Sequence, residues 1–381
     1  MKGYFRKRGN KWSFTIDIGR NPKTGKRIQK TRTGFKTKKE AQAEAAKLHY
    51  ELTQGTYINE KNILFKDFAD EWLRLYERKV KVSTIRIRKH EMERLKQVID
   101  NIPINKITHK MYQDAIDQLS KRYSVRSLKG MHVTARMIFK KALQLGVISK
   151  DPTEFVELPK DESPQDFYFM EKNELGLFLD AAKKHGLDMD YVLFSTLAYS
   201  GMRIGELLAL QHDDLDFVNN TIDINKTLYM PSNNRNKYEL LTPKTKTSIR
   251  TIKMDNQVMK LLQRHLLEQK KWALALPDFK QLGFVFPHPR DGHPQPQNRS
   301  KLRMKRILRL ANMNEDYKLH TFRHTHVSLL AEAGAGVKEI MERLGHGDIN
   351  TTMKVYAHVT KDMDEKTTQQ FSELLSGYHK L

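Results

Sequence analysis

The chain of 381 residues contains no cysteine. Disulfides, thiolate metal sites and a cysteine nucleophile are therefore excluded, and only His, Asp or Glu could hold a metal. The chain also lacks an apolar run long enough to span a bilayer, and Met1 to Arg8 lack the apolar core of a signal peptide. We therefore expect a cytoplasmic protein. No Gly-x-x-x-x-Gly-Lys phosphate loop occurs, so no motif indicates the use of ATP.

Positive charge is abundant and unevenly distributed. The formal net charge is +23, of which residues 1–62 carry +11, residues 63–160 carry +9 and residues 161–381 carry +3. Such an excess favours a polyanion that releases counterions when its phosphates meet Lys and Arg. A basic soluble surface or an anionic membrane face are alternatives. Because no basic amphipathic helix or lipidation signal accompanies the charge, nucleic acid is the favoured partner.

The first segment alternates apolar and polar residues between positions 4 and 35, which predicts strands. Turn residues at 8–10 and 21–25 separate them, so we expect a three-stranded antiparallel sheet. Thr37 then caps a helix whose apolar face would cover one side of the sheet. The other side would carry Lys, Arg and Thr, as in a sheet that enters a DNA groove, although any small α+β module could share this pattern.

The second segment, residues 63–160, predicts helices only. Apolar residues from Phe65 to Tyr76 have helical spacing, Ser83 opens a second helix, and Ser124 to Leu145 carry a third apolar stripe. Helix breakers between 146 and 164 end this segment and predict a domain boundary.

The third segment is mixed and mainly helical. Predicted helices are Lys172–Lys184, Tyr191–Tyr199, Arg203–Leu210, Gln257–Trp272, Gln297–Ala311, Thr321–Ala333, Val337–Leu344 and Thr351–His358. Predicted short strands are Thr221–Lys226, Ser248–Ile252 and Phe284–Phe286. The whole chain is thus expected to be a multidomain α+β protein. It would have a small three-stranded sheet with a helix, an all-helical domain, and a mainly helical domain with a small antiparallel sheet.

Two islands of unusual residues open the third segment. In the first, a glycine turn precedes Arg203, which would lie at a helix N-terminus, and Glu206 follows at the i, i+3 spacing of an ion pair. The second is a basic turn at 242–250, from which Lys244 or Lys246 could give a proton to a leaving oxygen. Taken alone, the first island is better explained as a surface ion pair and the second as a solvated loop.

Two further islands follow. His320 and Arg323 share a helical face, and Gly345-His346-Gly347 is followed by Tyr356, ten residues after His346. His320 and His324 also have the spacing of zinc ligands. Thr321, however, occupies the position where the metalloprotease pattern requires Glu.

Together the islands supply two arginines, a lysine, two histidines and a tyrosine, a set suited to phosphoryl transfer without a metal. Two bidentate Arg side chains match the charge that grows on a phosphodiester under attack. A tyrosine nucleophile would keep the bond energy in a phosphotyrosine ester, so that the reverse attack by a DNA hydroxyl needs no ATP.

The order Arg, Lys, His-x-x-Arg, Gly-His and then Tyr closely resembles the catalytic signature of the tyrosine recombinases, and more narrowly the integrases of phages and conjugative transposons. The resemblance covers essentially the whole chain. It implies an arm-type DNA-binding domain at 1–57, a helical SAM-like core-binding domain at 63–159 and a catalytic domain with a tail helix at 165–381. The enzyme would use neither a metal nor another cofactor.

The resemblance also implies how the phosphate is bound. Arg203 and Arg323 would clamp the scissile phosphate, His346 would support it, and Glu206 would orient Arg203. These groups would stabilise charge rather than form bonds.

Proton transfer and covalent chemistry fall to the remaining residues of the signature. Lys244 would act as general acid toward the 5′ oxygen, with Lys246 on the same turn as the alternative. His320 would assist proton transfer, and Tyr356 would form the 3′ phosphotyrosine.

The partners implied by the resemblance are double-stranded DNA with core and arm-type attachment sites and further copies of the chain, as a homotetramer in the synaptic complex. A directionality factor, a host DNA-bending protein and a location at the bacterial nucleoid belong to the same expectation, whereas a membrane partner does not. The activity would be integration and excision of a mobile element. An amphipathic helix predicted at Asp364–Leu375 would dock on its own domain or on the next protomer.

Two other functions compete with this one. A non-catalytic DNA-binding regulator could keep the fold, but it would tolerate loss of Arg203, Arg323 and Tyr356, all of which are present. A type IB topoisomerase would share the chemistry. The additional N-terminal sheet module favours recognition of specific sites instead.

Overall fold

The computed structural model describes residues 4–20, 24–53, 62–161, 168–232, 234–243 and 245–345, together with residues 347, 349, 352, 353 and 356 and without the side chain of Lys246. The chain divides into two compact units, Met1–Ser163 and Pro164–Leu381. Separate hydrophobic cores form in the N-terminal sheet module and in the helical segment of the first unit. No helix in the described ranges is long and apolar enough to cross a membrane.

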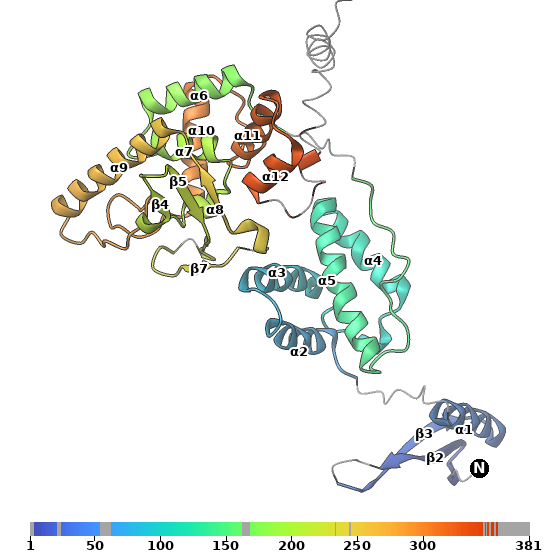
Figure 1. Cartoon of the computed structure of the whole chain (residues 1–381). Helices are drawn as coiled ribbons and strands as arrows, with labels where there is room; N and C mark the ends of the chain where they lie inside the picture. Colours follow the sequence, from blue (N-terminus) through green and yellow to red (C-terminus); the bar gives the residue numbers. More distant parts are fainter. Residues whose placement is uncertain are drawn as a thin grey trace, which may run out of the picture. The chain divides into compact units, whose positions relative to one another are not determined.

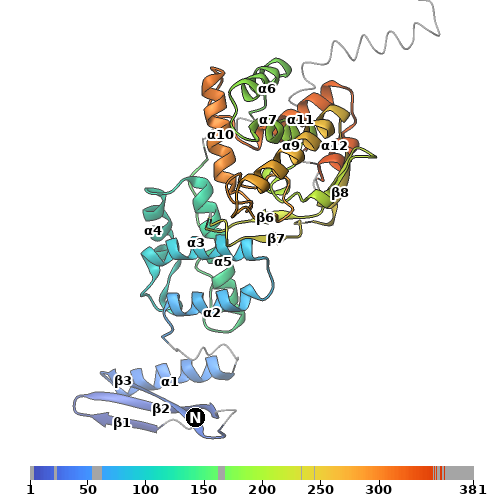
Figure 2. The same cartoon turned by 90° about the vertical axis from the view of Figure 1, so that its left-hand side faces the viewer.

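The N-terminal module is the predicted three-stranded antiparallel sheet. Strands β1 (Tyr4–Arg8), β2 (Lys11–Arg20) and β3 (Arg27–Phe35) pair in the order β1-β2-β3. Helix α1 (Lys38–Thr53) covers one face, as Figure 2 shows. The core between helix and sheet is formed by Phe14, Ile16, Ala41, Ala45 and Leu48.

The predicted cap of this module is confirmed, and the uncovered face carries part of the predicted set of Lys, Arg and Thr. The Glu40 backbone N–H donates to the Thr37 hydroxyl at 3.1 Å, so Thr37 caps α1. On the uncovered face, the Thr15 and Thr31 hydroxyls lie 2.8 Å apart, and Tyr4, opposite Thr15, is 70% exposed. Arg6, next on that face of β1, is also exposed.

The helical segment contains α2 (Phe65–Glu77), α3 (Val82–Ile99), α4 (His109–Ser120) and α5 (Val125–Gln144), with a short 3₁₀ turn, η1 (Ile104–Lys106). Apart from an isolated bridge between Leu64 and Pro103, residues 62–161 contain no strand pairing, as predicted. Ser124 caps α5 by accepting from Ser127 N–H at 3.4 Å. Helix α4 was not predicted, and α3 begins before Ser83.

In the second unit, helices from the beginning and from the end of its sequence pack together (Figure 1). Helices α6 (Lys172–His185), α7 (Asp190–Ser200), α9 (Asn256–Ala275), α10 (Gln297–Leu310) and α11 (Thr321–Glu332) surround the main core. Helix α12 (Val337–Leu344) packs on α11 in a smaller cluster.

A small antiparallel sheet completes the unit. Its strands β4 (Leu215–Asp216), β5 (Thr221–Ile224) and β8 (Arg250–Lys253) pair in the order β4-β5-β8. Strands β6 (Thr227–Tyr229) and β7 (Glu239–Leu241) form a separate hairpin. Short helical turns are α8 (Ile204–Leu207), η2 (His212–Asp214) and η3 (Lys246–Ser248).

Three predictions need correction. The helix predicted at Arg203–Leu210 covers only Ile204–Leu207. Ser248 belongs to η3, so β8 begins at Arg250. Phe284–Phe286 is not a strand: Phe284 makes an isolated bridge to Gln211, and all three residues are apolar because they lie in the core.

The C-terminal predictions are described only in part. Within the predicted helix Thr351–His358, Thr352, Met353 and Tyr356 are described and helical. The predicted tail helix Asp364–Leu375 lies outside the described residues.

We expect Phe322→Ala to destabilise the second unit by about 3–5 kcal/mol. The Phe322 ring is fully buried, stacked on Phe194 at 5.6 Å between centroids and edge-on to Phe178 at 5.3 Å. Urea unfolding measures the loss. Leu302→Ala, at a residue 60% exposed, is the control and should change stability by about 0.5 kcal/mol or less. Equal losses in the two variants would contradict the packing described.

Candidate active site

A buried carboxylate joins the first two sequence islands. Glu206 on α8 is 3% exposed. It accepts from the Arg203 guanidinium at 2.7 Å and from the Arg203 backbone N–H at 3.0 Å. On its other side it accepts from Arg250 Nη2 at 3.1 Å. The predicted i, i+3 pair is therefore present, and a second arginine from β8 completes it.

The charge of Glu206 is stabilised by these neighbours. Burial alone would raise its pKa, but the Arg250 charge and the hydrogen bonds and charge of Arg203 hold the pKa of Glu206 below its usual value. The carboxylate is therefore ionised at neutral pH, and it partly neutralises a site that is rich in arginine.

Arg323 on α11 is 1% exposed, the lowest value among the predicted site residues that the structure describes. Its guanidinium donates to the backbone oxygen of Gly201 at 2.9 Å and to that of Leu344 at 2.8 Å. Burial, and then the charges of Arg203 and Arg250, lower the pKa of Arg323 to about 9. The side chain is held by rigid backbone at the ends of α7 and α12, so its orientation is fixed before any ligand binds.

His320 lies at the start of α11, beside these arginines. Desolvation of the ring by its surroundings, followed by the effects of His324, Arg323 and Arg203, lowers the pKa of His320 to about 4, although the residue as a whole is exposed. At neutral pH the imidazole is therefore uncharged and can accept a proton or a hydrogen bond.

The turn with the two lysines packs against the end of α12. Gly345 ends that helix with φ of 68°, and its backbone oxygen lies 3.5 Å from the Ser248 hydroxyl. A Cβ at Gly345 would lie only 2.8 Å from the Thr247 backbone oxygen. A side chain is therefore incompatible with this position, both sterically and conformationally. The second and fourth islands are thus in direct contact through backbone.

The remaining predicted residues are placed as follows. Lys244, the Lys246 side chain and His346 lie outside the described part of the chain, although their neighbours Thr245 and Gly345 are within it. Tyr356 is partly buried and packs on a cluster of Val327, Ala331, Ile340 and Leu344 from α11 and α12. The structure thus brings Arg203, Glu206, His320 and Arg323 together, and it puts Tyr356 on the helix pair that carries Arg323.

Arg343 and His326 hold α12 in place, a role that the sequence analysis did not predict for them. Arg343 donates to His326 Nε2 at 3.0 Å and to the backbone oxygens of Lys253 and Tyr199, each at 3.0 Å. His326 in turn donates from Nδ1 to the Ala198 backbone oxygen at 2.8 Å. Together they fasten the last turn of α12 to the end of α7 and to β8.

Arg250 also received no role from the sequence, because only Lys244 and Lys246 of the second island were considered as functional residues. One signal could have indicated that it is buried. Residues 250 and 252 share one face of a strand, and Ile252 belongs to the core. An arginine in register with a core residue needs a buried anion or carbonyl partner.

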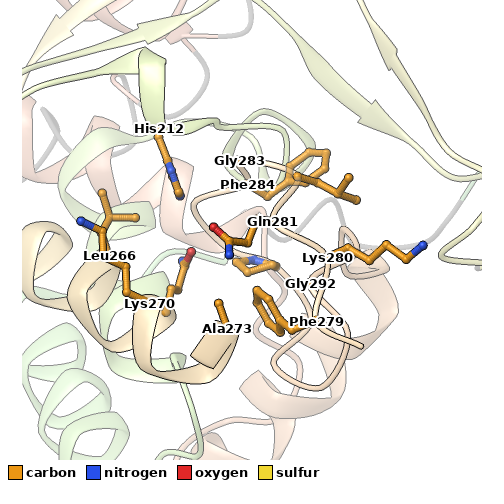
Figure 3. A pocket seen from close by; sticks show the side chains of 13 residues that line it. His212, Leu266, Lys270, Ala273, Phe279, Lys280, Gln281, Gly283, Phe284 and Gly292 are labelled. Carbon is orange, nitrogen blue, oxygen red and sulfur yellow. The ribbon is translucent and has the colours of Figure 1, made fainter. Parts of the chain in front are cut away.

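The site lies apart from a small cavity shown in Figure 3. That cavity, of about 50 Å³, lies between α9 and the loop around residues 279–292, and its lining includes His212, Lys270 and Phe279. None of the island residues lines it, and its volume suits water rather than a substrate.

The metal alternative concerns His320 and His324, whose rings lie edge to face with centroids 4.7 Å apart. Within the described residues, no group of three or more His, Asp or Glu side chains could hold a metal ion. The same place holds positive charge from three arginines, which suits an anion such as a phosphodiester.

Family models match three consecutive parts of the chain. The phage integrase family matches residues 168–363, an arm DNA-binding domain matches residues 4–52, and the N-terminal SAM-like domain of phage integrases matches residues 64–120.

Two similar proteins span nearly the whole length. The integrase of Staphylococcus phage L54a is 31% identical over 349 residues, which is 86% of this chain and 98% of that protein. The ICEBs1 integrase of Bacillus subtilis (strain 168) is 27% identical over 377 residues, 96% of this chain and 97% of that protein.

Solved structures share the fold. The Tn1549 transposon integrase in complex with transposon right end DNA has a TM-score of 0.69 at 22% identity, covering 81% of this chain and 100% of that one. A lambda integrase tetramer bound to a Holliday junction has a TM-score of 0.56 at 15% identity, covering 91% and 95%.

The pKa of His326, lowered to about 4 mainly by burial, predicts a loss of stability in acid. The unfolded chain binds a proton at this histidine near pH 6.5, whereas the folded protein does so only near pH 4. Stability should therefore fall as pH drops through this window, by about 3 kcal/mol from His326 alone. Urea unfolding at pH 7 and pH 4.5 should show a loss roughly 2 kcal/mol smaller in His326→Gln than in the wild type.

The matched control is His185→Gln, at an exposed residue at the end of α6. It should lose as much stability as the wild type over the same interval. Parallel curves for wild type and His326→Gln would show that His326 is not held neutral by the fold.

Proposed function

Because this chain belongs to the phage integrase family, the tyrosine recombinases that cleave and rejoin DNA, we propose that Arg203, Arg323 and Tyr356 carry out its chemistry. The observation that carries this proposal is the arginine cluster around Glu206. Arg203 and Arg323 lie close enough for each charge to act on the other, and both act on His320. A scissile phosphate is the anion that this cluster would accept.

The proposed first step is attack by the Tyr356 hydroxyl oxygen on the scissile phosphorus. The new bond joins phosphorus to the tyrosine oxygen, and the bond from phosphorus to the 5′ oxygen of the DNA breaks. Neutral His320 would take the phenol proton. Its pKa of about 4 belongs to the site without DNA, and the negative charge of a bound phosphate would raise it and make His320 a stronger base. Arg203 and Arg323 would stabilise the negative charge that grows on the non-bridging oxygens.

The leaving 5′ oxygen needs a proton, which we assign to Lys244, with Lys246 as the alternative. Support comes from the position of their turn, which packs through Ser248 against Gly345 and ends at Arg250. In the second step, the 5′ hydroxyl oxygen of another strand attacks the phosphotyrosine, so that a bond from phosphorus to this oxygen forms and the bond from phosphorus to the Tyr356 oxygen breaks. The lysine takes the proton of the 5′ hydroxyl, and protonated His320 returns a proton to Tyr356. The ester keeps the bond energy, so we expect neither ATP nor a metal to be needed.

The proposed substrate is double-stranded DNA with two kinds of site. The sheet module, as an arm-type domain over residues 1–57, would bind arm sites through its uncovered basic face. The helical segment, 63–159, would bind the core site that residues 165–381 cut. The net charges of +11 and +9 on the first two segments support this division.

Assembly is proposed from relatives, since lambda integrase is solved as a dimer on a core site and as a tetramer on a Holliday junction. We propose a homotetramer that brings two duplexes together for integration and excision of a mobile element. A directionality factor and a host DNA-bending protein would select between these outcomes, in the cytoplasm where the DNA lies.

Tyr356→Phe should abolish formation of a covalent protein–DNA adduct. The test mixes protein with nicked attachment-site DNA in EDTA, followed by SDS denaturation and electrophoresis. Wild type should give a slow-migrating adduct and Tyr356→Phe none. Tyr317→Phe is the matched control, because Tyr317 donates to Glu174 at 2.8 Å, outside the island cluster. An adduct with Tyr356→Phe, or relaxation of plasmid lacking any attachment site, would contradict the proposal.

Lys244→Ala and Lys246→Ala should separate the two candidate acids. The variant that loses the general acid should cleave an ordinary phosphodiester roughly 10²–10⁴-fold more slowly. Its rate should recover on DNA with sulfur in place of the scissile 5′ oxygen, because a thiolate leaves without a proton. The other variant should show little loss. Recovery in neither variant would contradict an acid on this turn.

A further inference from the structure

All three nitrogens of the Arg250 guanidinium donate hydrogen bonds within the protein. The side chain is 6% exposed at the first residue of β8. Its Nε donates to the Arg343 backbone oxygen at 2.7 Å, and Nη1 donates to the Ser248 backbone oxygen at 2.9 Å. Its Nη2 donates to the Glu206 carboxylate at 3.1 Å. Each nitrogen therefore has a specific acceptor.

Those three acceptors lie on three different parts of the predicted site. Glu206 is the carboxylate that contacts Arg203, and Ser248 ends the turn that carries both lysines. Arg343 is in the last turn of α12, directly before Leu344 and Gly345. One planar side chain thus joins the phosphate-binding arginine, the lysine turn and the segment that leads to His346.

The contact with Glu206 has the largest consequence for Arg203. The Arg203 side chain is 40% exposed, so it has freedom that only its partners restrict. Its side-chain partner is Glu206 Oε1, while Oε2 receives both the Arg203 backbone N–H and Arg250. Loss of Arg250 would leave a buried carboxylate with one charged partner, free to rotate toward Arg203 or to take up a proton.

The geometry around Gly345 supports this close arrangement. A Cβ there would lie 3.1 Å from Arg250 Nη1, so a side chain at this position would press on the guanidinium. The last carbonyl oxygens of α12 accept hydrogen bonds from arginines on two other elements, Arg250 on β8 and Arg323 on α11. Cations at a helix C-terminus interact favourably with its unpaired carbonyls.

We propose that Arg250 is a positioning residue for DNA cleavage: acting through Glu206, it orients Arg203 for the scissile phosphate. This inference rests on the proposed function, in which Arg203 binds that phosphate. Arg250 itself contacts neither the DNA nor the reacting atoms.

The test compares Arg250→Met with wild type in two measurements. Fluorescence anisotropy gives the Kd for attachment-site DNA, and single-turnover adduct formation at saturating protein gives the cleavage rate. We expect Kd to change by less than about 3-fold, because DNA affinity comes chiefly from backbone contacts elsewhere, and the cleavage rate to fall roughly 10–100-fold. Circular dichroism establishes that the variant is folded. If it is not, Arg250→Lys, which keeps the charge but cannot serve all three acceptors, is measured instead.

A double-mutant cycle tests the route through Glu206. In a protein that already carries Glu206→Gln, the substitution of Arg250 should lower the cleavage rate by less than about 3-fold, because the link from Arg250 to Arg203 is already broken. Arg343→Lys is the matched control: Arg343 also fastens α12 to β8 but makes no contact with Glu206. Its effect on cleavage should multiply with that of Glu206→Gln.

Two outcomes would overturn the inference while leaving the proposed function intact. One is cleavage by the Arg250 variant at the wild-type rate. The other is a cycle in which the Arg250 and Glu206 effects multiply. Failure of the proposed function looks different: wild type would form no adduct, or Tyr356→Phe would form one.

Discussion

A carboxylate buried among arginine side chains lets guanidinium groups gather before any DNA is bound. Glu206 accepts from Arg203 and Arg250, and its charge also acts on Arg323 and His320. Without this anion, the mutual repulsion of the arginines in a site of low dielectric would separate them. The arrangement of the rest of the site depends on this carboxylate. Arg250, which donates to it, also contacts the lysine turn and the end of α12.

The sequence predicted the helices and the polar residues of the site better than the hydrogen bonds and ion pairs that join these residues. Helices with strong apolar periodicity, such as α6, α10 and α12, were predicted to within a residue or two, because local burial pattern and capping determine them. A strand was wrongly predicted at Phe284–Phe286, because a short apolar run looks the same in the sequence whether the segment pairs in a sheet or only packs in the core. The role of Arg250 could not be predicted, since its partners lie 44 and 93 positions away in the sequence.

The distribution of charge separates DNA affinity from chemistry. The sheet module and the helical segment carry most of the net positive charge, and contacts with phosphates position a protein without reading sequence. The third segment is nearly balanced, because it contains almost as many acidic as basic residues. Within it, Arg203 and Arg250 meet at Glu206, and Arg323 acts on the same site.

The depressed pKa of Arg323 has a consequence for the energetics of the empty protein. Burial and the nearby charges of Arg203 and Arg250 make the charged form of this guanidinium costly in the folded protein, and Glu206 offsets only part of that cost. A bound phosphodiester would add further negative charge beside it. Binding of DNA should therefore stabilise the charged form of Arg323 and, through it, the folded second unit.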